Sequence, residues 1–109
     1  MYVSYIGDVR RDELKRALEE VGALLVDLPA GFRLLTDLER LRSMDPAGMT
    51  EIGKIMEVLS KQGMELVVRV IPDPSKDIGL NILSIFHYGR RIRVVTCETM
   101  SEAAKALSL

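Results

Sequence analysis

The chain has 109 residues, of which 48% are hydrophobic and 28% are charged, which is enough apolar material for one buried core but too little length for two ordinary domains. These proportions exclude a disordered chain, a collagen-like repeat and a low-complexity linker. With 15 Lys and Arg residues against 16 Asp and Glu residues, the formal net charge is −1, so no overall field attracts nucleic acid or an anionic membrane.

The first third of the chain predicts a strand and a helix. Residues 2–6 alternate and carry β-forming side chains, and Gly7 with Asp8 ends this strand. Asp8 is the expected cap of the helix that follows. Residues 29–31 (Pro-Ala-Gly) break that helix. Its apolar residues recur at helical spacing: Leu14, Ala17, Leu18, Val21, Leu24, Leu25 and Leu28.

The middle of the chain predicts a strand over residues 33–38, a loop over 40–44 and a second helix. Asp45 followed by Pro46 is a strong helix start, because an acidic cap precedes a residue that lacks the N–H not needed there. Gly63 is well placed to end the helix in the left-handed conformation. The expected buried stripe is Met49, Ile52, Ile55, Met56 and Leu59.

The last part of the chain predicts two more strands and two more helices. Residues 65–71 are almost continuously apolar, which is typical of a strand covered on both faces, and Pro72 and Pro74 stop it. A helix over 77–88, a strand over 92–96 and a helix over 102–107 capped by Ser101 complete the pattern.

Strand and helix therefore alternate four times within one domain, residues 1–109. This order predicts an α/β fold with a mainly parallel, four-stranded open sheet flanked by helices. Function in such sheets is usually found at the carboxyl ends of the strands. In this sequence those ends are residues 7–8, 38–45, 72–76 and 97–99.

Residues 37–49 resemble the signature of STAS domains, the sulphate-transporter and anti-sigma-factor-antagonist group. That signature is an Asp and an apolar residue closing a strand, a loop with one buried apolar residue, and Asp-Ser-Ser-Gly-Leu opening a helix. The resemblance continues to Gly63 and the strand at 65–68, and elsewhere rests on element order. It implies a protein-interaction module. The matching positions are Asp37, Leu38, Leu41, Met44, Asp45, Gly48 and Met49.

The sequence departs from the STAS pattern in two respects. No residues correspond to the family's antiparallel first strand, and the Ser-Ser pair is replaced by Pro46 and Ala47. A hydroxyl at a helix N-terminus is what the family's phosphorylation switch requires, so that switch cannot operate at residue 46. The pattern of residues 31–37 (Gly-Phe-Arg-Leu-Leu-Thr-Asp) is similar to a divergent STAS-like, SEC14-like subset.

The resemblance implies a partner-docking loop around the start of the second helix. Asp45 alone is also explained as a helix cap, and Ser43 or Thr50 are the available substitute phosphate acceptors. The expected docking residues are Asp37, Ser43, Asp45, Pro46, Ala47, Gly48 and Thr50.

Two further segments are candidate binding regions. Asp73, Ser75 and Lys76 form either an ordinary stiff turn or a ligand or anion site before a helix. The helix after them has almost no polar face, with Ile78, Ile82, Ile85 and Phe86 among its apolar residues. A helix of this kind is either buried or covers an interface with a partner or a second copy.

Nothing in the sequence predicts catalysis or a metal site. Cys97 and His87 are the single cysteine and histidine, so neither an internal disulfide nor a zinc site can form from them, and Cys97 is expected in the core. No signal peptide or stretch of the roughly 18–20 apolar residues that span a membrane is present. We therefore expect a cytoplasmic, non-enzymatic interaction module without a cofactor, or alternatively a domain that binds a small apolar or anionic ligand.

Overall fold

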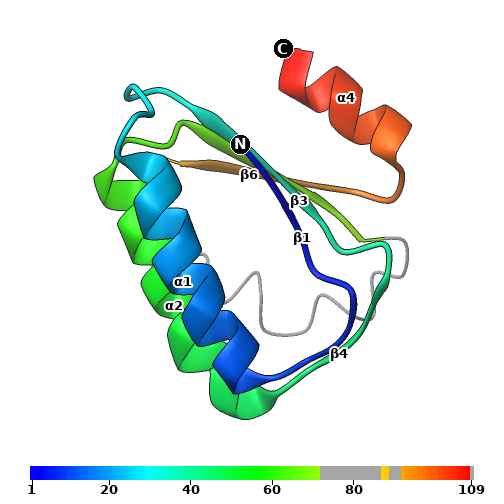
Figure 1. Cartoon of the computed structure of the whole chain (residues 1–109). Helices are drawn as coiled ribbons and strands as arrows, with labels where there is room; N and C mark the ends of the chain where they lie inside the picture. Colours follow the sequence, from blue (N-terminus) through cyan, green and yellow to red (C-terminus); the bar gives the residue numbers. More distant parts are fainter. Residues whose placement is uncertain (72–86, 89–91, 109) are drawn as a thin grey trace.

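The sheet is organised around β5 (Leu66–Val70), whose five residues are all buried. In the computed structural model, which describes residues 1–71, 87–88 and 92–108, β5 lies between β3 (Arg33–Asp37) and β6 (Arg93–Cys97). β1 (Tyr2–Ser4) pairs with the other side of β3. All pairings among these strands are parallel and give the order β1-β3-β5-β6 (Figure 1).

Helices cover both faces of this sheet, which confirms the predicted α/β fold (Figure 1). α1 (Arg11–Leu25) and α2 (Met49–Lys61) pack together on one face, and α4 (Met100–Ser108) packs on β5 and β6 from the other. Because side chains alternate along a strand, β5 contributes to both layers. The smaller core, beneath α4, contains Leu66, Val68, Val70, Cys97 and Ala103.

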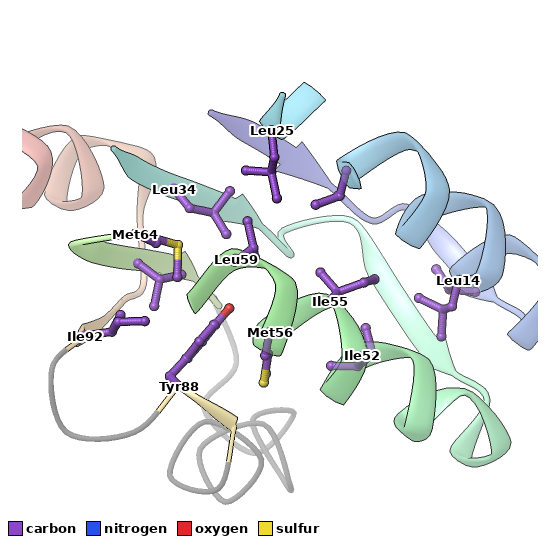
Figure 2. Packing of buried hydrophobic residues seen from close by; sticks show 13 residues of the cluster. Leu14, Leu25, Leu34, Ile52, Ile55, Met56, Leu59, Met64, Tyr88 and Ile92 are labelled. Carbon is purple, nitrogen blue, oxygen red and sulfur yellow. The ribbon is translucent and has the colours of Figure 1, made fainter. Parts of the chain in front are cut away.

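The larger core lies between the sheet and the pair α1–α2. Figure 2 shows Leu34 of β3 lying near Leu25 of α1 and Leu59 of α2, with further buried side chains of both helices extending along this layer. The predicted stripe of α2 is confirmed, since its members are buried except for the half-buried Met49. In α1 the stripe is confirmed at Leu14, Val21 and Leu25, but Leu24 is 59% exposed.

The predicted start and end of the second helix are confirmed. The Asp45 side chain caps a 3₁₀ turn, η1 (Pro46–Gly48), which runs directly into α2. After α2, Gly63 has a φ of +92°, the left-handed conformation that glycine adopts without steric cost.

The predicted loop at 40–44 is wrong, because Leu41–Met44 form strand β4, which pairs in parallel with β2 (Gly7–Val9). The first strand ends at Ser4, and Gly7, with a φ of +72°, turns the chain from β1 into β2. Asp8 consequently lies in β2 and does not cap α1. Arg10 holds the cap position, and its N–H donates to the Glu13 side chain.

The start of the last helix also differs from the prediction. Thr99, rather than Ser101, caps α4, since its Oγ1 accepts a hydrogen bond of 3.1 Å from the Glu102 N–H. The helix therefore begins at Met100. Most of the predicted helix 77–88 lies outside the described residues. Only its last two residues, 87 and 88, are described.

Candidate functional site

One exposed surface lies beyond the carboxyl ends of β1 and β3. The chain leaves these strands through β2 and β4, and these lead to the start of α1 and to η1 (Figure 1). The strand-end surface, as we call it, comprises the exposed residues Asp8, Arg42, Ser43, Pro46, Ala47 and Thr50.

Asp8 is the most strongly held side chain of the strand-end surface. Arg42 donates to both of its carboxylate oxygens, from Nε at 3.0 Å and from Nη2 at 2.5 Å, and the Ser43 hydroxyl donates at 2.6 Å. These hydrogen bonds, that of Arg42 first and that of Ser43 second, lower the pKa of Asp8 to about 2. Asp8 is therefore an anion throughout the neutral range and a weak base.

Asp45 fixes the turn between β4 and α2. Its carboxylate accepts from the Ala47 N–H at 3.0 Å, and its own N–H donates to the Val9 carbonyl at 2.8 Å. Gly48 is buried in the same turn, where a Cβ would overlap the Leu14 side chain. The hydrogen bonds of Asp45 and the packing of Gly48 therefore fix the backbone that presents the exposed residues Pro46, Ala47 and Thr50.

Asp37 is not brought to the strand-end surface. Its register partners across the sheet include Val70 and Cys97, which pack beneath α4, so it faces the layer opposite α2. There its carboxylate accepts from the Tyr2 hydroxyl at 2.8 Å and from the Glu39 N–H at 3.0 Å. The remaining predicted docking residues lie within one stretch of the chain, 43–50, from the end of β4 through η1 to the first turn of α2.

The other predicted binding residues fall outside the described chain. These are Asp73, Ser75, Lys76, Ile78, Ile82, Ile85 and Phe86. His87 is described, and its Nδ1 lies 2.8 Å from Oε1 of Glu57 on α2. No group of His, Cys, Asp or Glu among the described residues is arranged to hold a metal ion. Cys97 is buried as expected, and burial raises the pKa of its thiol.

Sequence reasoning missed a cavity between α2 and the sheet. It is lined mainly by apolar side chains, together with Thr36, Arg69, Tyr5 and Tyr88. Arg69 is only 3% exposed. The signal in the sequence was a lone arginine inside the apolar run at 65–71, a segment predicted to be covered on both faces.

Comparison with solved structures identifies proteins that share this fold. No family model matches the chain, and no curated protein matches it. Among solved structures, an uncharacterised protein of the DUF3478 family with a SpoIIAA-like fold, from Shewanella loihica PV-4, superposes with a TM-score of 0.75 at 12% identity, over 97% of this chain and 82% of that one.

A second solved structure is the anti-sigma factor antagonist SpoIIAA in its unphosphorylated form. It superposes with a TM-score of 0.59 at 15% identity, over 98% of this chain and 87% of that one. In the part of our chain that the structure describes, no helix is long and apolar enough to cross a membrane. The chain therefore has a STAS-like α/β fold, the fold of the anti-sigma factor antagonist SpoIIAA.

Proposed function

We propose that the chain is a non-enzymatic interaction module of STAS type that docks a protein partner through the strand-end surface. The observation that carries this proposal is the ribbon β2–β4, which leads into the capped turn η1 and holds exposed side chains at the carboxyl ends of β1 and β3. Such strand ends are where α/β sheets usually bind. The likeness in fold to an anti-sigma factor antagonist supports the same assignment.

The chemistry of this surface favours docking over catalysis. Ser43 donates its hydroxyl to Asp8, but a carboxylate with a pKa of about 2 is too weak a base to activate a hydroxyl nucleophile. Pro46 has no hydroxyl for a phosphate. A phosphate on Ser43 would be repelled by Asp8. Thr50, exposed in the first turn of α2, is the better placed acceptor.

Replacing one of two exposed alanines with arginine tests the docking surface. Ala47 is exposed in η1, and Ala104 is exposed on α4 at the opposite face of the sheet. Wild type, Ala47→Arg and Ala104→Arg are expressed in the source cells with an affinity tag, and the proteins that copurify are compared. We expect a partner retained by wild type and Ala104→Arg and lost from Ala47→Arg. A copurifying set that is identical for all three proteins would contradict the proposal.

A homodimer through the apolar segment at 78–86 remains part of the proposal. The support is the sequence pattern alone. A helix predicted to have almost no polar face would expose a large apolar surface unless another chain buried it. We expect light scattering to give the mass of two chains for wild type and of one chain for Phe86→Glu. A single-chain mass for concentrated wild type rules out this dimer and leaves the docking of another protein untouched.

A further inference from the structure

The strand β1 has one open edge. It stands first in the order β1-β3-β5-β6, so among the described strands it pairs with β3 alone. The N–H of Tyr5, just after β1, donates to the Asp37 carbonyl at 3.1 Å. Because successive residues of a strand direct their backbone groups to opposite sides, the N–H groups of Tyr2 and Ser4 point away from β3. They form the kind of unpaired edge to which another strand can add.

A groove runs along this open edge, between β1 and α1. Both elements lie on the side of the molecule nearest the viewer in Figure 1. Each of the residues 2–6 lines the groove, which has a volume of about 330 Å³. Since the side chains of a strand alternate between its two faces, contact with consecutive residues means that the groove reaches the backbone edge itself. We call it the edge groove.

The edge groove also gathers exposed apolar side chains. Tyr2, Ile6 and Leu24 line it and are 56%, 58% and 59% exposed. They are three of the five large apolar side chains that the described residues expose. Single exposed apolar residues are ordinary on a protein surface, but their concentration beside one open strand edge favours a surface that a partner covers. This position also accounts for Leu24, the member of the predicted α1 stripe that the core does not bury.

Two exposed carboxylates lie along the α1 wall of the edge groove. They belong to Glu13 and Glu20, and no Lys or Arg is among the described residues that line the groove. Glu20 forms no ion pair with another described residue. Seven helical residues separate the two carboxylates by roughly 10 Å along the axis. Side chains four residues apart on one face of a strand are separated by roughly 13 Å, a difference that two long basic side chains can span.

The same charges argue against a second copy of this chain as the occupant. Residues 2–8 contain Asp8 and no Lys or Arg. A second β1 in the groove would therefore bring no cation to Glu13 and Glu20 and would place like charges together, which disfavours association. The complementary occupant is an extended segment with basic and apolar side chains.

We propose that the edge groove binds an extended segment of a partner protein, which adds a strand to β1. The segment pairs its backbone with Tyr2 and Ser4, packs an apolar side chain against Leu24, and directs two basic side chains toward Glu13 and Glu20. In this mode of binding the main-chain hydrogen bonds supply affinity and the side-chain contacts supply sequence preference. The edge groove shares no residue with the strand-end surface, so each proposal can fail without the other.

A synthetic peptide, acetyl-Thr-Lys-Val-Leu-Val-Lys-Thr-amide, is the probe, and the same peptide with Glu in place of both Lys is its control. Each is titrated into the full chain while backbone amide signals are followed by NMR. We expect the lysine peptide to shift amides of β1 and α1, to slow hydrogen exchange at the Ser4 N–H, and to bind about tenfold or more tightly than the glutamate peptide. Equal affinity for the two peptides, or shifts confined to β4, η1 and α2, would overturn the proposal.

Two charge reversals on α1 test the acidic wall. Glu20→Lys changes a residue of the edge groove, and Glu19→Lys makes the same change at an exposed neighbour that does not line it. At physiological ionic strength, where distant charges are screened, we expect the affinity for the lysine peptide to fall about fivefold in Glu20→Lys and to stay within about twofold of wild type in Glu19→Lys. Equal affinity of the two variants for the peptide counts against the edge groove.

A proline in β1 tests the strand pairing itself. Ser4→Pro removes an N–H that points away from β3, a position at which edge strands tolerate proline. We expect this variant to remain folded by circular dichroism and to lose binding of the lysine peptide. If folded Ser4→Pro binds the peptide as tightly as wild type, the peptide does not pair with β1 and the proposal is wrong. If Ser4→Pro does not fold, the exchange rate at Ser4 and the Glu20→Lys variant decide the matter. A wild-type dimer that folded Ser4→Pro converts to a monomer in light scattering would identify a second copy as the occupant and overturn the proposal.

Discussion

Asp8 shows how the fold changes the chemistry of a single residue. Its two side-chain partners, Arg42 and Ser43, are 34 and 35 residues distant in the sequence. Without knowledge of that contact, an Asp just before a helical pattern is reasonably predicted to be a cap. Asp45 was predictable because its cap contact with Ala47 spans two residues. Local contacts can be inferred from sequence, whereas contacts across the fold cannot.

The pKa of Asp8 provides a pH prediction. The pKa lies near 2 in the folded chain, below the ordinary value of 3.8, so folding favours the ionised form. The resulting stabilisation is present above about pH 4 and is lost as the pH falls toward 2. We expect carboxyl NMR to report a pKa near 2 for wild type and a value closer to 3.8 for Arg42→Ala. Arg40→Ala, an exposed neighbour, serves as control, and a wild-type value near 3.8 would contradict the ion pair.

The cap at Asp45 provides a stability prediction. Asp45→Ala removes the acceptor for the Ala47 N–H and should lower the free energy of unfolding by about 1 kcal/mol. Asp45→Asn keeps an oxygen at the same place and should lose far less. Urea unfolding of the three proteins measures both effects. Equal stability of Asp45→Ala and wild type would show that the cap contributes nothing.

At the scale of elements, the long helices and the central strand were predictable because their patterns are strong. The two-stranded β2–β4 ribbon was not. Each strand has only three or four residues, too few for a period to be read, and β4 carries Arg42 and Ser43, which resemble loop residues. Its existence depends on pairing with a segment more than 30 residues away.

Two glycines in helical segments should respond oppositely to alanine. A Cβ at Gly22, within α1, meets no atom within 4 Å, so Gly22→Ala should raise the free energy of unfolding by about 0.5–1 kcal/mol. A Cβ at Gly48 overlaps the fully buried Leu14, and Gly48→Ala should lower it by about 1–3 kcal/mol. Thermal or urea unfolding gives the sign of each change, and stabilisation by Gly48→Ala would refute the close packing of η1 against α1.

At the scale of the whole molecule, the order of elements was the most predictable property. The apolar patterns that produce it are compatible with very different sequences, since the superposition on the Shewanella loihica protein covers 97% of this chain at 12% identity. The cavity was less predictable because it depends on how well side chains from α2, β1, β3 and β5 fill the same space. Arg69 alone hinted at it.

The position of β5 between two helical layers predicts where the molecule is most stable. Its side chains belong alternately to the larger and the smaller core, so its amides should exchange with solvent only on global unfolding. α4 buries one residue, Ala103, and should exchange faster. Native-state hydrogen exchange measured by NMR orders the elements. Faster exchange in β5 than in α4 would be inconsistent with this architecture.

Met44 connects the cavity beneath α2 to the strand-end surface. It is the last residue of β4 and lines the cavity, while the adjacent Ser43 belongs to the exposed strand-end surface. A small molecule that entered this cavity and displaced Met44 would move the same strand that holds Ser43 and Arg42. If that displacement changes the affinity for a protein partner, thermodynamic reciprocity requires the partner to change the affinity for the ligand by the same factor. A single strand of four residues would then transmit an allosteric signal in both directions.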